Sequence, residues 1–177
     1  MEFVLIGVLV FSALLVGGLV LAQSGEPPAR GREAPAFDLP DTQGRRHTMA
    51  SCRGRRTVVF FFPMDDTPEC LAFVAACKDA LPRIEATGAR LLAVAVASPQ
   101  AVKAYREAQA IPFPVLADES GRAAKAWGTL TNFGLYKFAK KLAVVVDAGG
   151  RVERVWRDGV GASHVEEVVA TLETPAA

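Results

Sequence analysis

One cysteine closes the stretch FFPMDDTPEC, residues 61–70 of a chain of 177 residues. Just before it, Thr67 is a preferred helix N-cap, and Pro68 suits the first helical position, where a missing N–H leaves no bond unmade. Cys70 then falls in the first turn, where free backbone N–H groups stabilise a thiolate over a thiol. Because the thiolate is the nucleophile, this spacing predicts a reactive cysteine; the alternative is a small apolar side chain in the core.

The other cysteines and the two histidines show no pattern of a dithiol or metal site. Cys52 and Cys77 form no Cys-x-x-Cys pair, and an odd number of cysteines argues against a complete disulfide framework. His47 and His164 lack the spacing of metal ligands, so we expect neither a metal nor a cofactor. With a net charge of +1, the chain has no basic field for nucleic acid.

The cysteine follows directly on a segment with the pattern of a buried strand. Residues 57–62 read TVVFFF, which is typical of a strand buried on both faces and central in a sheet with helices on each side. The segment after such a strand lies at the carboxyl edge of the sheet, where α/β proteins place their sites. We expect a helix from Pro68 to about Thr87, ended by Gly88 and kinked or divided by Pro82.

The rest of the chain alternates predicted strands and helices, which indicates an α/β sandwich with a mostly parallel sheet. A short extended pair surrounds the turn DTQG, and the closing hairpin turns at residues 147–150. The expected elements are an extended pair at 36–49, strands at 90–97 and 113–118, helices at 98–110 and 119–127, a hairpin at 141–156, and a helix at 163–173 capped by Ser163.

Residues 3–22 form a run of twenty residues without a charge, which matches the hydrocarbon thickness of a bilayer. Two interpretations compete, a retained membrane anchor and a cleaved signal peptide. A signal peptide would begin with positive charge, whereas only Met1 and Glu2 precede the run, so an anchor is favoured.

We therefore divide the chain into a transmembrane anchor or signal sequence at 1–22, a polar linker at 23–35 and one domain at 36–177. Arg30 and Arg32 follow the apolar run, and neither Lys nor Arg precedes it. By the positive-inside rule, this asymmetry points to a cytoplasmic domain behind a single-pass anchor that contacts membrane lipid.

The stretch FFPMDDTPEC resembles the peroxiredoxin signature, whose proline, threonine and peroxidatic cysteine have the spacing of Pro63, Thr67 and Cys70. Three further segments, APAFDLPDTQGRRHTM, FPVLADESGRAAKAWG and LAVVVDAGGRVERVW, are similar to the bacterioferritin-comigratory branch of that family. The resemblance covers residues 31–175. It implies a thioredoxin-like α/β sandwich with a central mixed sheet flanked by helices.

The resemblance also implies a reaction. The Cys70 thiolate would attack hydrogen peroxide or an alkyl hydroperoxide and become a sulfenic acid, which a thioredoxin-like thiol reductant restores. Thr67 would orient the peroxide, Pro63 would shield the pocket, and Lys141 stands where the family has an arginine that donates hydrogen bonds to the thiolate and the leaving oxygen.

Three positions depart from the family pattern. Lys141 keeps the charge of the arginine but loses its planar fork. Phe73 stands where the family often has a glutamate that would hold that arginine. The branch often has a resolving cysteine five residues after the peroxidatic one, whereas the next cysteine here is Cys77, seven residues after Cys70. Seven residues rise about 10 Å along an intact helix, beyond the roughly 7 Å between Cα atoms that a disulfide spans, so the helix would have to unwind. Cys77 and Cys52 remain the candidates for a resolving cysteine. Cys77 is interpreted equally well as core packing, and for Cys52 core packing is the favoured interpretation.

These departures leave a second hypothesis beside the enzyme, a non-catalytic thioredoxin-fold accessory subunit packed against other subunits of a membrane complex. Residues 127–141 are rich in aromatic residues and lysines. They are interpreted either as a loop that packs Trp127, Phe133 and Tyr136 over the sheet edge, or as a surface that contacts membrane or a partner.

Overall fold

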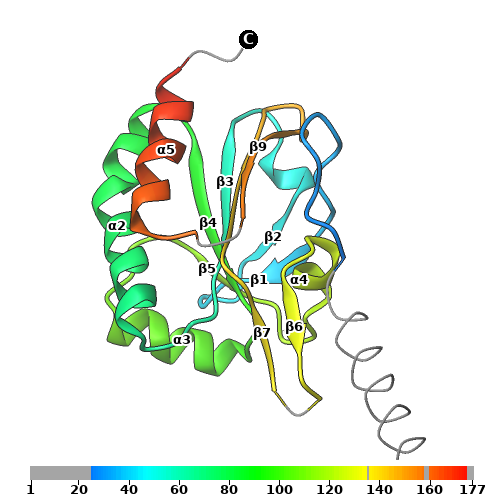
Figure 1. The fold of residues 1–177 in the computed structure, drawn as a ribbon, viewed down its shortest axis with the longest axis vertical. Coiled ribbons are helices and arrows are strands. Elements are labelled where there is room, and N and C mark those ends of the chain that lie inside the picture. Colours follow the sequence, from blue (N-terminus) through cyan, green and yellow to red (C-terminus); the bar gives the residue numbers. More distant parts are fainter. Residues whose placement is uncertain (1–24, 135, 158–159, 175–177) are drawn as a thin grey trace, which may run out of the picture.

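The computed structural model describes residues 25–134, 136–157 and 160–174, which surround a five-stranded sheet (Figure 1). The strand order is β5-β4-β3-β8-β9. β3 pairs in parallel with β4, and β4 with β5, while β8 pairs antiparallel with both β3 and β9. The sheet is therefore mixed, as the family resemblance implies, and the closing β8–β9 hairpin is antiparallel as expected. Because β8 also pairs antiparallel with β3, half of the four pairings are parallel rather than most of them. The strands are β3 (Thr57–Phe61), β4 (Arg90–Ala95), β5 (Val115–Ala117), β8 (Leu142–Val146) and β9 (Val152–Trp156).

Helices and a small hairpin cover the two faces of this sheet (Figure 1). One face carries α2 (Pro68–Ala86), α3 (Pro99–Ala108) and α5 (Ala162–Glu173). The other carries α4 (Arg122–Ala126), the short helix η1 (Ala50–Cys52), and the hairpin of β1 (Asp38–Pro40) and β2 (Arg46–Thr48). Val58, Phe60 and Phe62 pack into the first core, and Val59 and Phe61 into the second. The alternation confirms that β3 is buried on both faces.

The long helix α2 begins where local chemistry predicts. Thr67 is its N-cap, and the left-handed Gly88, with φ of 77°, follows its end. Pro82 lies inside the helix and does not divide it, so the alternative of two separate helices is wrong. The apolar face of α2 continues past the proline to Ile84, which is fully buried. Packing of this face outweighs the loss of one backbone hydrogen bond.

Two other expectations about elements are corrected. The last helix starts at Ala162 rather than after a Ser163 cap, because the Gly161 N–H donates to His164 Nδ1 at 3.2 Å. Residues 127–141 are not a loop over the sheet edge, because they contain the hairpin of β6 (Leu130–Asn132) and β7 (Lys137–Ala139).

Arg56 joins the amino end of β3 to the last strand and helix. Its guanidinium makes a bidentate ion pair with Glu153 on β9, with Nε at 2.9 Å from Oε2. It also donates to the carbonyl oxygens of Thr171, Leu172 and Thr174 at 2.9, 2.9 and 3.0 Å. A cation that donates to the last carbonyls of a helix completes their hydrogen bonding and complements the helix dipole.

No helix within residues 25–134, 136–157 and 160–174 is long and apolar enough to cross a bilayer. The expected anchor at residues 3–22 lies outside the described residues. The described part of the expected linker contacts the domain, since the Gly31 N–H donates to the Val152 carbonyl at 2.7 Å and the Ala34 N–H to the Gly150 carbonyl at 2.9 Å.

Candidate active site

Cys70 occupies the first turn of α2, directly after the carboxyl end of β3, as the sequence predicts. The Cys70 N–H donates to Thr67 Oγ1 at 3.3 Å, which confirms the N-cap. The Thr67 hydroxyl in turn donates to Asp65 Oδ1 at 2.7 Å, and the Thr67 N–H reaches the same oxygen at 3.3 Å. Asp65 therefore fixes the orientation of the hydroxyl beside the cysteine.

The Cys70 side chain is fully buried. Its sulfur lies 3.9 Å from the hydroxyl of Tyr105 on α3, and that hydroxyl donates to the Asp65 carbonyl at 3.2 Å. Burial raises the pKa of the Cys70 thiol, and hydrogen bonds from the Asp65 backbone and from Tyr105 only partly oppose it. The lowered pKa expected at a helix N-terminus is thus absent from the structure, because desolvation outweighs the effect of the helix terminus.

The Asp65 carboxylate remains ionised beside the thiol. Burial alone would raise the pKa of Asp65, but hydrogen bonds from the hydroxyl and backbone of Thr67 outweigh it, and the positive charge of Lys141 adds to their effect. The net result is a lowered pKa. A fixed negative charge at this position repels a thiolate and so contributes to the raised pKa of Cys70.

A pocket of about 670 Å³ opens next to this turn. Pro63, Thr67 and Lys141, which are three of the predicted site residues, all line it, whereas the buried Cys70 does not. The other lining side chains include apolar and charged groups from the segments around β7, β8 and β9: Phe138, Lys140, Leu142, Arg157 and Val160.

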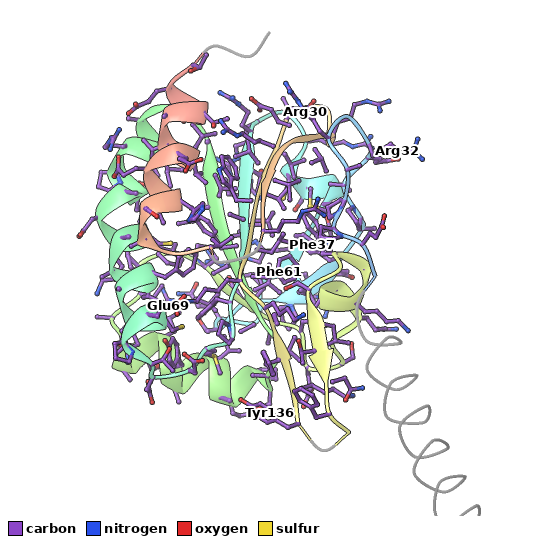
Figure 2. The ribbon with its side chains drawn as sticks, viewed as in Figure 1. Arg30, Arg32, Phe37, Phe61, Glu69 and Tyr136 are labelled. Atoms are coloured by element: carbon purple, nitrogen blue, oxygen red, sulfur yellow. The ribbon has the colours of Figure 1, made fainter. Side chains whose placement is uncertain are left out.

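Lys141 is held by a carboxylate other than the one expected from the family pattern. Its Nζ donates to Glu69 Oε1 at 2.7 Å, and the Lys141 side chain is only 13% exposed against 72% for Glu69. Glu69 projects from the start of α2 (Figure 2). Phe73 stands where the family often has the expected glutamate, and its side chain is buried in the core. Its ring contacts the ring of Phe60 edge-to-face, with centroids 5.1 Å apart. Glu69 therefore supplies an anionic partner for the cation at the pocket.

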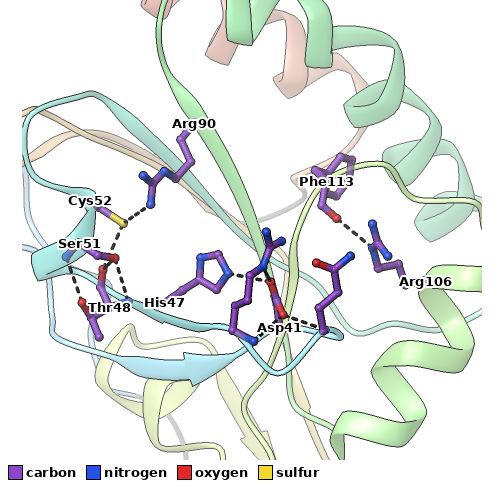
Figure 3. Close-up of polar contacts among 10 residues, drawn as sticks. Asp41, His47, Thr48, Ser51, Cys52, Arg90, Arg106 and Phe113 are labelled. Carbon is purple, nitrogen blue, oxygen red and sulfur yellow. Dashed lines mark hydrogen bonds and ion pairs between the residues drawn. The ribbon is translucent and has the colours of Figure 1, made fainter.

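The structure does not bring the two possible resolving cysteines to Cys70. Cys77 is buried two turns further along α2, and burial raises the pKa of its thiol far above the ordinary range. Cys52 packs in the core on the opposite face of the sheet. Its thiol donates to the Thr48 carbonyl at 3.3 Å and accepts from Arg90 Nη1 at 3.8 Å (Figure 3). All three thiols are free.

Sequence reasoning missed Asp65, Tyr105 and Glu69 as parts of this site. Asp65 could have been found, because an aspartate two residues before a capped helix start commonly hydrogen-bonds the backbone there. Tyr105 carries no such signal, since it reaches Cys70 only through the packing of α3. Within the described ranges, no three His, Cys, Asp or Glu side chains gather as a metal site.

The chain is similar to curated peroxiredoxins. Peroxiredoxin Q, chloroplastic, of Sedum lineare is 28% identical over 147 residues, which cover 82% of this chain and 78% of that protein. Peroxiredoxin Bcp of Escherichia coli strain K12 is 26% identical over 151 residues, 83% of this chain and 97% of that protein.

A solved structure, peroxidoxin BcpB from Mycobacterium tuberculosis, matches with a TM-score of 0.75 at 21% identity, over 82% of this chain and 97% of that one. This likeness shows that the thioredoxin-like peroxiredoxin fold is shared. The model of the AhpC/TSA family matches residues 30–155, which is more than half of the chain. The chain therefore belongs to the AhpC/TSA family.

Proposed function

We propose that this chain is a thiol peroxidase in which Cys70 reduces hydrogen peroxide or an alkyl hydroperoxide. The observation that carries the proposal is that Pro63, Thr67 and Lys141 line one pocket beside the helix turn that holds Cys70. The relatives named above are peroxiredoxins, which supports the same activity. They do not favour the alternative of a non-catalytic accessory subunit.

The reaction follows from these positions. The Cys70 thiolate attacks one peroxide oxygen, so that an S–O bond forms while the O–O bond breaks. The sulfur is oxidised to a sulfenic acid, and the leaving oxygen takes a proton to become water or an alcohol. Negative charge develops on the leaving oxygen, and the Lys141 ammonium at the pocket stabilises it.

We further propose that an external thiol, such as a thioredoxin-like reductant, completes the cycle. Its attack on the sulfenic acid releases water and leaves a mixed disulfide, which a second thiol reduces. Cys52 lies across the sheet from Cys70, and Cys77 lies about 10 Å along the same helix. An internal disulfide would require α2 to unwind or the chain to cross the sheet, which favours an external partner.

Tethering to a membrane is a further part of the proposal. Its support is the uncharged run at residues 3–22, with the charge asymmetry of Arg30 and Arg32 favouring a cytoplasmic domain. Alkaline extraction of membranes tests it: a spanning chain stays in the pellet, and a peripheral one is released. A mature protein that begins near residue 23 would instead identify a cleaved signal peptide.

The enzyme is tested by oxidising the full chain in mild detergent with hydrogen peroxide and trapping the product with dimedone. Mass spectrometry is expected to find the adduct on Cys70. Stopped-flow measurement is expected to show oxidation of the chain only when hydrogen peroxide is added. Cys70→Ser is expected to abolish both signals, whereas the matched Cys77→Ser and Cys52→Ser changes retain them. An adduct that persists in Cys70→Ser would overturn the assignment of the nucleophile.

A further inference from the structure

The β6–β7 hairpin carries apolar rings that the fold leaves uncovered. Phe133 and Tyr136 are 64% and 61% exposed, and they are the exposed large apolar side chains in the described part of the chain. Both contact Phe138, with ring centroids 6.4 and 5.6 Å apart. The three rings form one aromatic cluster, and an exposed cluster of this kind marks a contact surface.

The same segment has a strong bias of charge. Between Ser120 and Val146 the sequence contains no Asp or Glu but five basic residues: Arg122, Lys125, Lys137, Lys140 and Lys141. Of these, Lys141 is paired with Glu69, whereas Lys137 and Lys140 are exposed and have no ion-pair partner among the described residues. The hairpin therefore offers lysines beside aromatic rings, a combination typical of membrane–water interfaces.

The amino-terminal part of the described chain packs at the base of this hairpin. A Cβ on Gly128, which lies between α4 and β6, would come within 2.4 Å of both Glu26 and Pro27 backbone atoms. A Cβ on Gly25 would lie 3.2 Å from the Lys125 carbonyl oxygen. In the sequence, the uncharged run at residues 3–22 ends three residues before Gly25, so the described residues nearest to it contact the base of the hairpin.

The linker arginines lie elsewhere. Figure 2 shows Arg30 and Arg32 at the end of the molecule opposite Tyr136. The aromatic cluster, rather than the linker arginines, is therefore on the side of the domain that the described residues nearest to the apolar run contact.

We propose that the β6–β7 hairpin docks on the surface of an anionic bilayer, with Phe133, Tyr136 and Phe138 among the headgroups and Lys137 and Lys140 against their phosphates. This inference rests on the proposed membrane tether. Phe138 and Lys140 also line the candidate active-site pocket, so docking holds the mouth of that pocket at the lipid–water boundary. Each lysine near an anionic surface strengthens binding by about fivefold.

The test uses the full chain in two kinds of lipid nanodisc, phosphatidylcholine alone and phosphatidylcholine mixed with phosphatidylglycerol. Amide hydrogen exchange is measured across β6 and β7. Exchange is expected to be about fivefold or more slower in the anionic discs than in the neutral ones. Lys137→Glu and Phe133→Ser are expected to remove this difference. Arg55→Glu, a matched charge reversal at the amino end of β3, is expected to leave it unchanged.

Equal exchange rates of the hairpin amides in both discs and in detergent would overturn the docking. Protection of the hairpin in detergent that increases with protein concentration would also overturn it, because it would indicate that a second copy of the chain covers the rings. The tether is tested separately: release of the chain from both kinds of disc at alkaline pH would contradict a spanning segment. Failure of the enzyme is seen separately again, as no dimedone adduct on Cys70 in detergent. A chain that stays on the discs without hairpin protection contradicts the docking alone.

Discussion

The Lys141 ammonium and the Glu69 carboxylate lie 2.7 Å apart and join the start of β8 to the first turn of α2. This ion pair places a cation at the wall of the candidate active-site pocket. The carboxylate is largely exposed, so water weakens the pair, and its main role is to orient the lysine rather than to stabilise the fold.

Replacement of Lys141 tests that role. Lys141→Met is expected to lower the second-order rate constant for Cys70 oxidation by about a hundredfold, because a positioned donor at developing charge is lost. Lys141→Arg is expected to raise the rate constant, since its planar fork can bind Glu69 and the leaving oxygen together. Stopped-flow measurement with hydrogen peroxide checks both. A Met variant as fast as the parent would show that Lys141 does not act on the reaction.

Tyr105→Phe removes one hydroxyl and keeps the ring. We expect about 1 kcal/mol less free energy of unfolding, because the bond to the Asp65 carbonyl is lost. Tyr105 also lowers the pKa of Cys70, so the variant is expected to move the alkylation profile of Cys70 to higher pH. Urea unfolding and iodoacetamide rates against pH measure the two effects. An unchanged pH profile would mean that the 3.9 Å contact does not persist in solution.

Asp41 is expected to contribute to the loss of stability in acid. Burial opposes its ionisation, but hydrogen bonds from His47, the Gln43 N–H and Arg45 lower its pKa to about 2. The pKa of Asp41 in the folded state lies below its unfolded value near 3.8. Its ionised form therefore contributes about 2 kcal/mol to the free energy of unfolding above pH 4, and this contribution is lost as the pH falls towards 2. Asp41→Asn removes that pH-dependent part in unfolding titrations, while Asp79→Asn, at an exposed carboxylate on α2, serves as control.

Arg56→Lys keeps the charge and removes the fork that binds Glu153 and three carbonyl oxygens. The free energy of unfolding is expected to fall by about 2 kcal/mol, since several charge-assisted bonds at a half-buried site are lost. Arg53→Lys is the matched control, because Arg53 makes one exposed ion pair with Glu33. Equal effects of the two changes would contradict the described role of Arg56.

Much of the fold follows from rules that act over a few residues. The cap at Thr67 and the buried strand before it were predictable because each depends only on its neighbours in sequence. The division of α2 at Pro82 was not found, because long-range packing of the helix outweighs a local helix breaker. The hairpin at 130–139 was missed because its aromatic residues follow no clear period, and two of them face solvent.

The sequence predicted three residues that line the pocket, but it predicted neither Asp65, Tyr105 and Glu69 nor the burial of Cys70. The motif placed Pro63, Thr67 and Lys141 at one pocket, because a shared family pattern already encodes the fold that brings them together. The burial of Cys70 depends instead on Tyr105, thirty-five residues further along the chain. The sequence-based expectation of a lowered thiol pKa considered the helix terminus alone, without the desolvation that this packing imposes.

The complete burial of Cys70 is expected to limit the rate at which peroxide oxidises it. In the proposed reaction peroxide has to reach this buried sulfur, and we expect the first helical turn to open for it in a unimolecular step. The rate of oxidation is therefore expected to rise with peroxide concentration and then level off at the opening rate. The proposed enzyme would then reduce peroxide at a rate proportional to its concentration when peroxide is scarce. At high peroxide concentration the rate would stay constant, and the remaining peroxide would not be reduced.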